Sequence, residues 1–365
     1  MLSALVIGCG GGGGGEGGGG AEVCADPEAC TEVASGVAVS TVVSFTAALT
    51  DIPGTDLSGS AAALGRAGRR PLEIARELAL AAVVPASGGA QAGGAAECGR
   101  CPLGGTVCAS CSEGGGSSTV SGSFSSCRGE DDYGNTLLMN GNLSVTVGAA
   151  GVCRTGEVPD GVSMRMRLNG FSVVITDRYG DTIGRLTASF TASIEPHGYG
   201  CAGEDFTESL DGSFDIQSAE DDVNGALRFR ALRLEVESAG FPCVRDIRAN
   251  GGFDVNDRAN GRRFSQDFRE FHVTLADAGG EIVATLAGGV KIDCVGDVTL
   301  QTRSPIRLAR GTACPHDGLL AVTRSEGTGL IHFTASGGVE FDYDGNGTVD
   351  AFAASCEDES VSQCR

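Results

Sequence analysis

The chain has 365 residues, of which 59 are Gly and 15 are Cys, and its formal net charge at pH 7 is −21. This charge excludes nucleic acid and anionic membrane surfaces as electrostatic partners, because both would be repelled, and it makes cations the natural counterpart. No apolar segment is long enough for a transmembrane helix, which needs about 18 residues or more. The length allows one or two domains, and the many Gly residues without any Trp fit an exported β-rich protein with tight turns.

The first feature along the chain is a short apolar run, Val6-Ile7-Gly8, that ends at Cys9. It resembles the lipobox of bacterial lipoproteins, in which diacylglycerol is attached to the cysteine and cleavage makes it the first residue. The resemblance implies that residues 1–8 are a truncated signal-like segment and that Cys9 is a lipidation site. Only eight residues precede Cys9 and none is Lys or Arg, whereas an export signal has a basic start. Either the start codon lies upstream, or the segment has another origin.

Residues 9–30 are predicted to be a Gly-rich tether and a small loop between Cys24 and Cys30. A flexible tether of this length would hold the rest of the protein about 20 Å from a membrane. The glycines also match G-x-G-x-x-G, the phosphate-binding motif of dinucleotide-binding folds, which needs a strand before it and a helix after it. The Gly run, interrupted only by Glu16, cannot nucleate that helix. Dinucleotide binding is therefore disfavoured.

Residues 31–97 are predicted to be a helical segment followed by a linker. Pro71 can begin a helix, Leu72, Ala75 and Leu78 lie on one apolar stripe, and Pro85 ends the pattern. The preceding stretch, 33–49, is compatible with either a buried helix or a strand. Residues 86–97 are rich in Ala and Gly and form the linker.

Residues 98–365 are predicted to be an antiparallel β domain with degenerate repeats. Phe271, Val273 and Leu275 alternate with polar residues, as in a strand with one buried face. The alternation changes phase near Ala231, which predicts a β-bulge there. A repeat of an apolar or small residue, Gly, a large apolar residue and an alternating tail recurs at variable spacing, which favours a meander over a solenoid with fixed rungs. The repeat occurs at 139–145, 210–216, 249–255 and 286–292.

The expected fold class is therefore mainly β (α+β). We expect a long curved antiparallel sheet or an open barrel, with the N-terminal helical segment packed on it.

The odd number of cysteines needs an explanation in an exported protein. Lipidation of Cys9 would leave fourteen (15 − 1), an even number that allows seven disulfides in an oxidising compartment. Cys98-x-x-Cys101 and Cys108-x-x-Cys111 also have the spacing of paired zinc ligands. The six residues between the two pairs are few for a zinc ribbon, and export favours oxidation, so disulfides are the preferred interpretation.

Three segments carry a wider resemblance: 101–107, 120–127 and 138–143. Their Gly and strand pattern looks like that of uncharacterised β-rich lipoproteins of Gram-negative bacteria, over most of residues 98–356. The resemblance implies no enzymatic activity. It does imply that Cys101 pairs with Cys127, whereas Cys108 and Cys111 depart from the pattern.

Residues 342–350, Asp-Tyr-Asp-Gly-Asn-Gly-Thr-Val-Asp, are the best candidate for a functional site. They resemble the D-x-D-G-N-G calcium loops of extracellular proteins, with oxygen ligands at alternating positions and Gly347 at a sharp turn. Position 12 is Ala353 in place of the bidentate Glu of an EF-hand. The alternative is a plain Asn-Gly hairpin turn with solvated acidic residues. The predicted metal ligands are Asp342, Asp344, Asn346, Thr348 and Asp350, and the possible cofactor is Ca²⁺.

No catalytic residues are predicted, because no nucleophile, base and orienting group occur together. The expected function is that of an exported lipoprotein anchored in the bacterial outer membrane, on its periplasmic or surface face. Its role would be non-enzymatic: structural, adhesive or binding, with a protein or lipid partner and no nucleic acid. The alternative is a carrier of lipid or another hydrophobic ligand, which would use the apolar face of the curved sheet. Whether residues 31–85 fill that face would distinguish the two.

Overall fold

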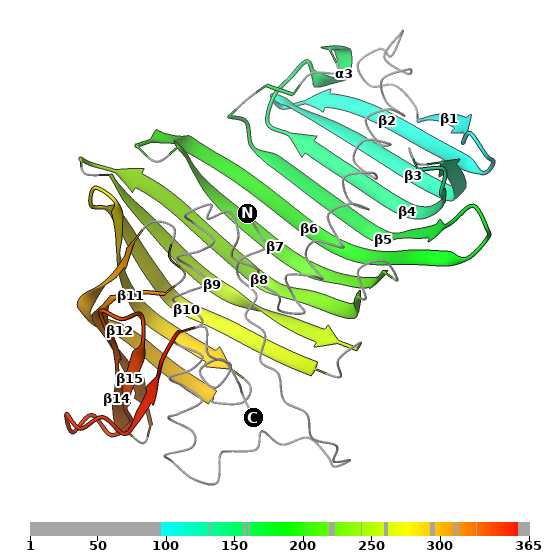
Figure 1. Ribbon diagram of the computed structural model, residues 1–365. Coiled ribbons are helices and arrows are strands. Elements are labelled where there is room, and N and C mark those ends of the chain that lie inside the picture. Colours follow the sequence, from blue (N-terminus) through cyan, green and yellow to red (C-terminus); the bar gives the residue numbers. More distant parts are fainter. Residues whose placement is uncertain are drawn as a thin grey trace. The chain divides into compact units, whose positions relative to one another are not determined.

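The computed structural model describes residues 96–356, with gaps at 131–132, 156–157, 160, 202, 219–222, 242, 259–261, 293–295, 310–311, 313 and 326. The described residues form 16 strands and one short helix (Figure 1). The elements are β1 (Glu97–Arg100), β2 (Thr106–Gly114), β3 (Ser117–Glu130), β4 (Thr136–Val147), α3 (Val152–Thr155), β5 (Met164–Thr176), β6 (Thr182–Gly200), β7 (Gly203–Ser218), β8 (Val223–Ala239), β9 (Val244–Asp257), β10 (Arg262–Asp277), β11 (Glu281–Ile292), β12 (Gly296–Ala309), β13 (Asp317–Arg324), β14 (Gly327–Phe333), β15 (Val339–Asp342) and β16 (Ala351–Ala353).

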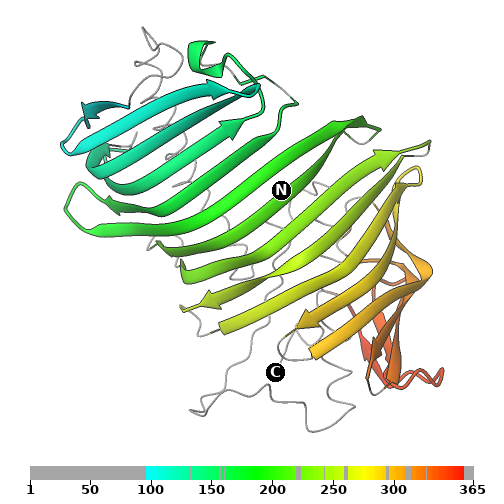
Figure 2. The ribbon, with the colours of Figure 1, turned by 180° about the vertical axis from the view of Figure 1, so that it is seen from behind.

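The strands form one open antiparallel sheet in which spatial order follows chain order from β1 to β16. Neighbouring strands are joined by turns, such as residues 177–181 between β5 and β6 and residues 278–280 between β10 and β11 (Figure 2). The prediction of a mainly β, antiparallel fold is confirmed. The predicted helical segment, the Gly-rich tether and Cys9 lie outside the described residues. Among the described residues, no helix is long and apolar enough to cross a bilayer.

The described chain divides into two compact units. The first unit consists of residues 96–198 and 206–231, and the second of residues 199–205 and 232–356. In the first unit Phe171 and Val173 of β5 are fully buried. In the second, Phe271 and Val273 of β10 are 0% and 1% exposed, as their alternation predicts.

A repeated β-bulge explains the degenerate sequence repeat. In β3, residues 125 and 126 together lie opposite the single residue Asn140 of β4, and Asn140 Oδ1 accepts a 2.8 Å hydrogen bond from the N–H of Ser126. Ser126 has a φ of 47°, in the left-handed region. In the same way, Oδ1 of Asp211 accepts a 3.1 Å hydrogen bond from the N–H of Ala231, whose φ is 46°.

The left-handed backbone at Ala231 confirms the bulge that the phase change predicted. Leu227 and Phe229 are buried before it, and Leu232 and Leu234 after it.

Close approach of a neighbouring strand explains why a Gly follows the polar residue in two copies of the repeat. A Cβ added to Gly141 would lie 2.2 Å from the carbonyl oxygen of Gly170 on the next strand. A Cβ on Gly212 would lie 2.3 Å from the carbonyl oxygen of Ser189. In the copies at 139–145 and 210–216, a polar residue thus binds the N–H of a bulge, and the Gly after it leaves room for the neighbouring backbone.

Five disulfides join cysteines of the described residues: Cys98–Cys108, Cys101–Cys127, Cys111–Cys153, Cys201–Cys243 and Cys314–Cys356. The four cysteines with zinc-like spacing therefore belong to three different disulfides, which supports the interpretation that disulfides form in place of a zinc site. Cys101 is bonded to Cys127, the pair that the family resemblance implied.

Candidate metal site

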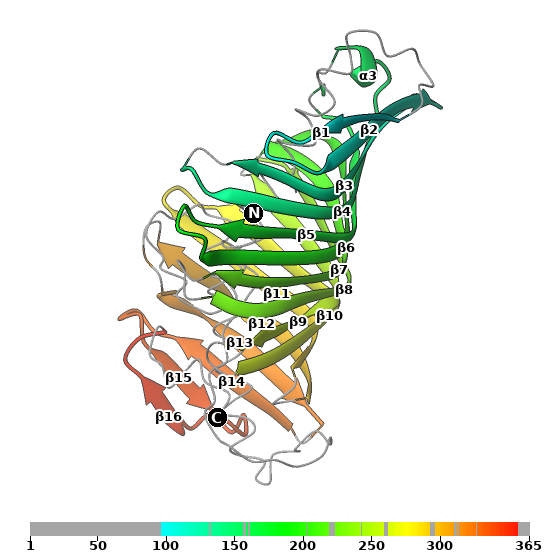
Figure 3. The ribbon, with the colours of Figure 1, turned by 90° about the vertical axis from the view of Figure 1, so that its right-hand side faces the viewer.

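The candidate loop connects β15 and β16 at the C-terminal end of the sheet (Figure 3). Val339 pairs with Ala353 and Phe341 with Ala351, so the two strands form a hairpin. Eight residues, 343–350, separate the two strands, so the hairpin connection is a long loop.

Hydrogen bonds from the loop backbone fix the carboxylate of Asp342. Its Oδ1 accepts bonds from the N–H groups of Gly345 (2.7 Å) and Asn346 (3.1 Å), and its Oδ2 accepts one from Gly347 (2.7 Å). Asp342 is 8% exposed, because it lies at the end of β15 with the loop wrapped around it. A buried carboxylate that accepts several backbone bonds is held in one orientation.

Two glycines allow the loop to turn this tightly. Gly345 and Gly347 have φ values of 72° and 88°, in the region that favours glycine. A Cβ on Gly345 would also lie 2.5 Å from the carbonyl oxygen of Thr328 on β14. The sequence pattern accounts for Gly347, but nothing in it points to Thr328, because that contact comes from a strand earlier in the chain.

Three carboxylates converge in this loop. Asp342, Asp344 and Asp350 each offer an oxygen, and these atoms lie within 4.8 Å of one another. At that distance two negative charges repel by about 1 kcal/mol in water and about 3 kcal/mol at an effective dielectric constant of 20. Within the described part of the chain, no Lys, Arg or His forms an ion pair with any of them. A cation would relieve this repulsion.

The other two predicted ligands, Asn346 and Thr348, lie in the same loop but are not part of the group of three carboxylates. Oδ1 of Asn346 accepts a hydrogen bond from the N–H of Thr348 (2.7 Å), and its Nδ2 donates one to Asp344 (2.8 Å). The Asn346 side chain is thus engaged within the loop. Oδ2 of Asp350 accepts a bond from the N–H of Tyr343 (2.7 Å), which closes the loop at its base.

The donor set consists of oxygen atoms alone, which suits hard cations such as Ca²⁺ or Mg²⁺ and not the softer metals that prefer His or Cys. Ala353, at the position of the EF-hand Glu, is a buried residue of β16 and has no side-chain oxygen to offer. The three Asp residues can hold a metal ion, with fewer protein ligands than an EF-hand provides.

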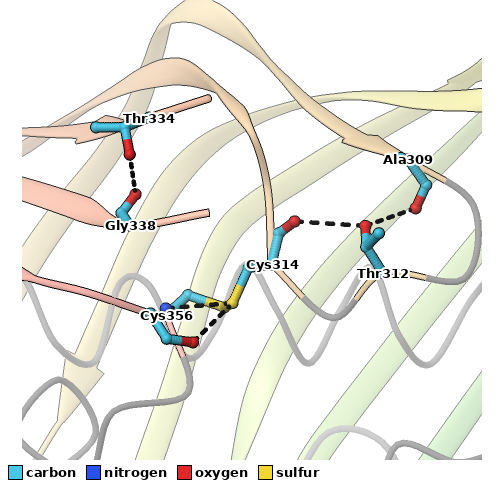
Figure 4. Close-up of a disulfide and its surroundings, with 7 residues drawn as sticks. Ala309, Thr312, Cys314, Thr334, Gly338 and Cys356 are labelled. Atoms are coloured by element: carbon cyan, nitrogen blue, oxygen red, sulfur yellow. Dashed lines mark hydrogen bonds between the residues drawn. A yellow bond between two sulfur atoms is a disulfide. The ribbon is translucent and has the colours of Figure 1, made fainter. Parts of the chain in front are cut away.

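A disulfide links two segments at the C-terminal end of the sheet. Cys356, three residues after β16, is bonded to Cys314, which precedes β13 (Figure 4). The N–H of Cys356 also donates a 3.2 Å bond to Sγ of Cys314, and Thr334 closes the turn between β14 and β15 by donating to the carbonyl of Gly338. The segment that follows the hairpin is therefore covalently linked to the segment that precedes β13.

Comparisons with known proteins add no family to this description. No family model, no curated protein and no solved structure matches the chain.

Proposed function

We propose that this chain is an exported lipoprotein of the bacterial outer membrane, anchored through Cys9, with a non-enzymatic structural or adhesive role. The observation that carries the proposal is the pairing of all ten described cysteines in disulfides. Disulfides persist in oxidising compartments and are rare in the cytosol. The lipobox-like segment before Cys9 supports the anchor and leaves an even number of cysteines for pairing.

Intact mass spectrometry of the protein from its native host tests this proposal. We expect the protein in the membrane fraction, cleaved before Cys9 and carrying acyl chains, with the ten described cysteines resistant to alkylation until a reductant is added. The matched control is Cys9→Ser, which should be neither acylated nor retained by the membrane. A soluble, unacylated wild-type protein with reactive thiols would contradict both the anchor and the export.

We further propose that the Asp342–Asp350 loop binds Ca²⁺ and that the ion stabilises the β15–β16 hairpin. The support is the convergence of three carboxylates in a loop whose backbone already fixes Asp342. Because the bidentate Glu is missing, we expect the weak affinity of extracellular calcium modules, with a Kd of about 0.1–1 mM.

Thermal melting of the wild type and of Asp344→Asn tests calcium binding. In EDTA the variant should melt at a higher temperature than the wild type, because one of three repelling charges is removed. At a Ca²⁺ concentration of about ten times Kd the wild type should gain about 1.4 kcal/mol, and the variant should gain little. The control is Asp181→Ala, a change in the exposed turn between β5 and β6 that should leave the calcium shift intact. Equal melting of the wild type in Ca²⁺ and EDTA would overturn the proposal, and an equal shift with Mg²⁺ would overturn its choice of ion.

A further inference from the structure

The polar face of β2–β5 in the first unit carries a shallow groove of about 270 Å³. These four strands lie side by side in chain order (Figure 2). Val120 of β3 and Leu168 of β5 are buried and do not line the groove, whereas their neighbours Ser121 and Arg167 do.

Two cross-strand rows of short polar side chains line this groove. In the first row Ser121 of β3 lies opposite Ser144 of β4, and Ser144 lies opposite Arg167 of β5. In the second row, Asn142 of β4 lies opposite Asn169 of β5. Serine hydroxyls and Asn amides both donate and accept hydrogen bonds, and here they are held on paired strands.

The positive charge at this groove has no partner in the described part of the protein. Arg167 lines the groove, and Arg165 lies two residues before it on the same face of β5. Both side chains are exposed, and neither forms an ion pair or hydrogen bond with a described residue. Elsewhere arginines have carboxylate partners, as Arg269 has in Asp297 (2.7 Å) and Arg307 in Glu281 (3.2 Å). Among the described residues, no Asp or Glu lines the groove.

The lining selects a ligand by its chemistry. Side chains that donate and accept hydrogen bonds in rows match the hydroxyls of a sugar, and the planar guanidinium of Arg167 matches a carboxylate. A densely charged polyanion is disfavoured because the chain carries a net charge of −21. A glycan has more widely spaced carboxylates, and acidic residues beyond about 8 Å are screened at physiological salt.

We propose that the β2–β5 groove binds an acidic oligosaccharide, with its carboxylate on Arg167 and its hydroxyls on the Ser and Asn rows. This goes beyond the lipoprotein role, because it assigns a ligand class and a site that do not involve the metal loop.

Isothermal titration of the full chain with hexagalacturonate, in EDTA, tests the proposal. EDTA excludes any contribution from calcium at the Asp342–Asp350 loop. We expect binding to the wild type, at least tenfold weaker binding to Arg167→Ala, and about threefold weaker binding to Ser144→Ala. Arg167→Lys should give an intermediate affinity, since it keeps the charge and loses the planar donor pair. The neutral hexamer of glucose should bind at least tenfold more weakly than hexagalacturonate.

The matched control is Arg185→Ala on β6, which removes an exposed arginine that does not line the groove. It should bind hexagalacturonate as the wild type does, and the circular dichroism of all variants should be unchanged. The proposal is overturned if hexagalacturonate does not bind, if Arg167→Ala binds it as the wild type does, or if the neutral hexamer binds equally. A hexaglutamate peptide that binds as tightly as the sugar would overturn it in favour of an acidic peptide.

Discussion

The backbone N–H of Glu270 on β10 donates a 2.8 Å hydrogen bond to Oδ1 of Asn250 on β9. Glu270 has a φ of 47°, and residues 269 and 270 together lie opposite Asn250. The arrangement repeats the one between Ser126 and Asn140 in the other unit. The polar residue of the repeat thus binds the N–H that the bulge removes from the strand ladder.

We therefore expect Asn250→Ala to lower the free energy of unfolding by about 0.5–1.5 kcal/mol, the net value of one hydrogen bond. Glu270→Gly should raise it by up to about 1 kcal/mol, because Gly adopts the left-handed conformation without the cost that a side chain adds. Urea unfolding of both single variants and the double variant measures these values. A Glu270→Gly variant less stable than the wild type would show that the Glu270 side chain stabilises the bulge.

The second prediction concerns Gly288, the glycine in the copy of the repeat at 286–292. A Cβ on Gly288 of β11 would lie 2.5 Å from the carbonyl oxygen of Glu270, and Gly288 has a φ of 128°. Gly288→Ala should therefore lower the free energy of unfolding by more than about 2 kcal/mol, because the backbone strain and the clash with the main chain of Glu270 add together. The control is Gly279→Ala, in the turn between β10 and β11, where φ is 75° and nothing lies within 4 Å of the added Cβ. It should cost only the strain, about 1 kcal/mol. Equal losses of stability in the two variants would show that the Cβ at position 288 does not clash with the backbone of Glu270.

Some features of this fold can be predicted from the sequence and others cannot, and the difference has a physical cause. Period-two alternation predicts the buried face at Phe271 and Val273, and a phase change predicts the bulge at Ala231, because both depend on residues that are adjacent in the chain. The Asn250–Glu270 bond joins residues 20 positions apart and depends on strand register. Cysteine pairing and the groove around Arg167 depend on register in the same way, so spacing alone cannot predict them. In the Asp342–Asp350 loop, the carboxylates are close in sequence and predictable, whereas the contact of Gly345 with Thr328 is not.

The third prediction concerns pH. Glu208 on β7 is partly buried, and desolvation by this burial raises the pKa of its carboxyl above the ordinary value of 4.5. The Glu208 carboxyl therefore binds its proton more tightly in the folded protein than in the unfolded chain. The stability from this group is fully present below about pH 4.5 and is lost as pH rises through the raised pKa. Glu208→Gln, which stays neutral, should melt at a higher temperature than the wild type at pH 7.5, and this advantage should disappear near pH 4.

Removal of any negative charge could stabilise a chain with a net charge of −21. Glu195→Gln, at an exposed position on β6, measures that general effect. The difference between the two variants across the pH range isolates the burial of Glu208. Identical pH profiles of Glu208→Gln and Glu195→Gln would show that burial does not perturb Glu208.

The fourth prediction concerns Gln266, a buried polar residue of β10. It is 1% exposed, and neither Nε2 nor Oε1 of its side chain has a hydrogen-bond partner among the described residues. A buried amide without partners costs about 1–3 kcal/mol, because the hydrogen bonds it makes with water in the unfolded chain are lost. Gln266→Met keeps the length of the side chain and removes both polar atoms, so it should raise the free energy of unfolding by about that amount. Gln266→Ala should gain less or lose stability, because it also leaves a cavity. A Met variant less stable than the wild type, measured by urea unfolding, would mean that the amide is hydrogen-bonded in the folded protein and that its polarity is part of the core.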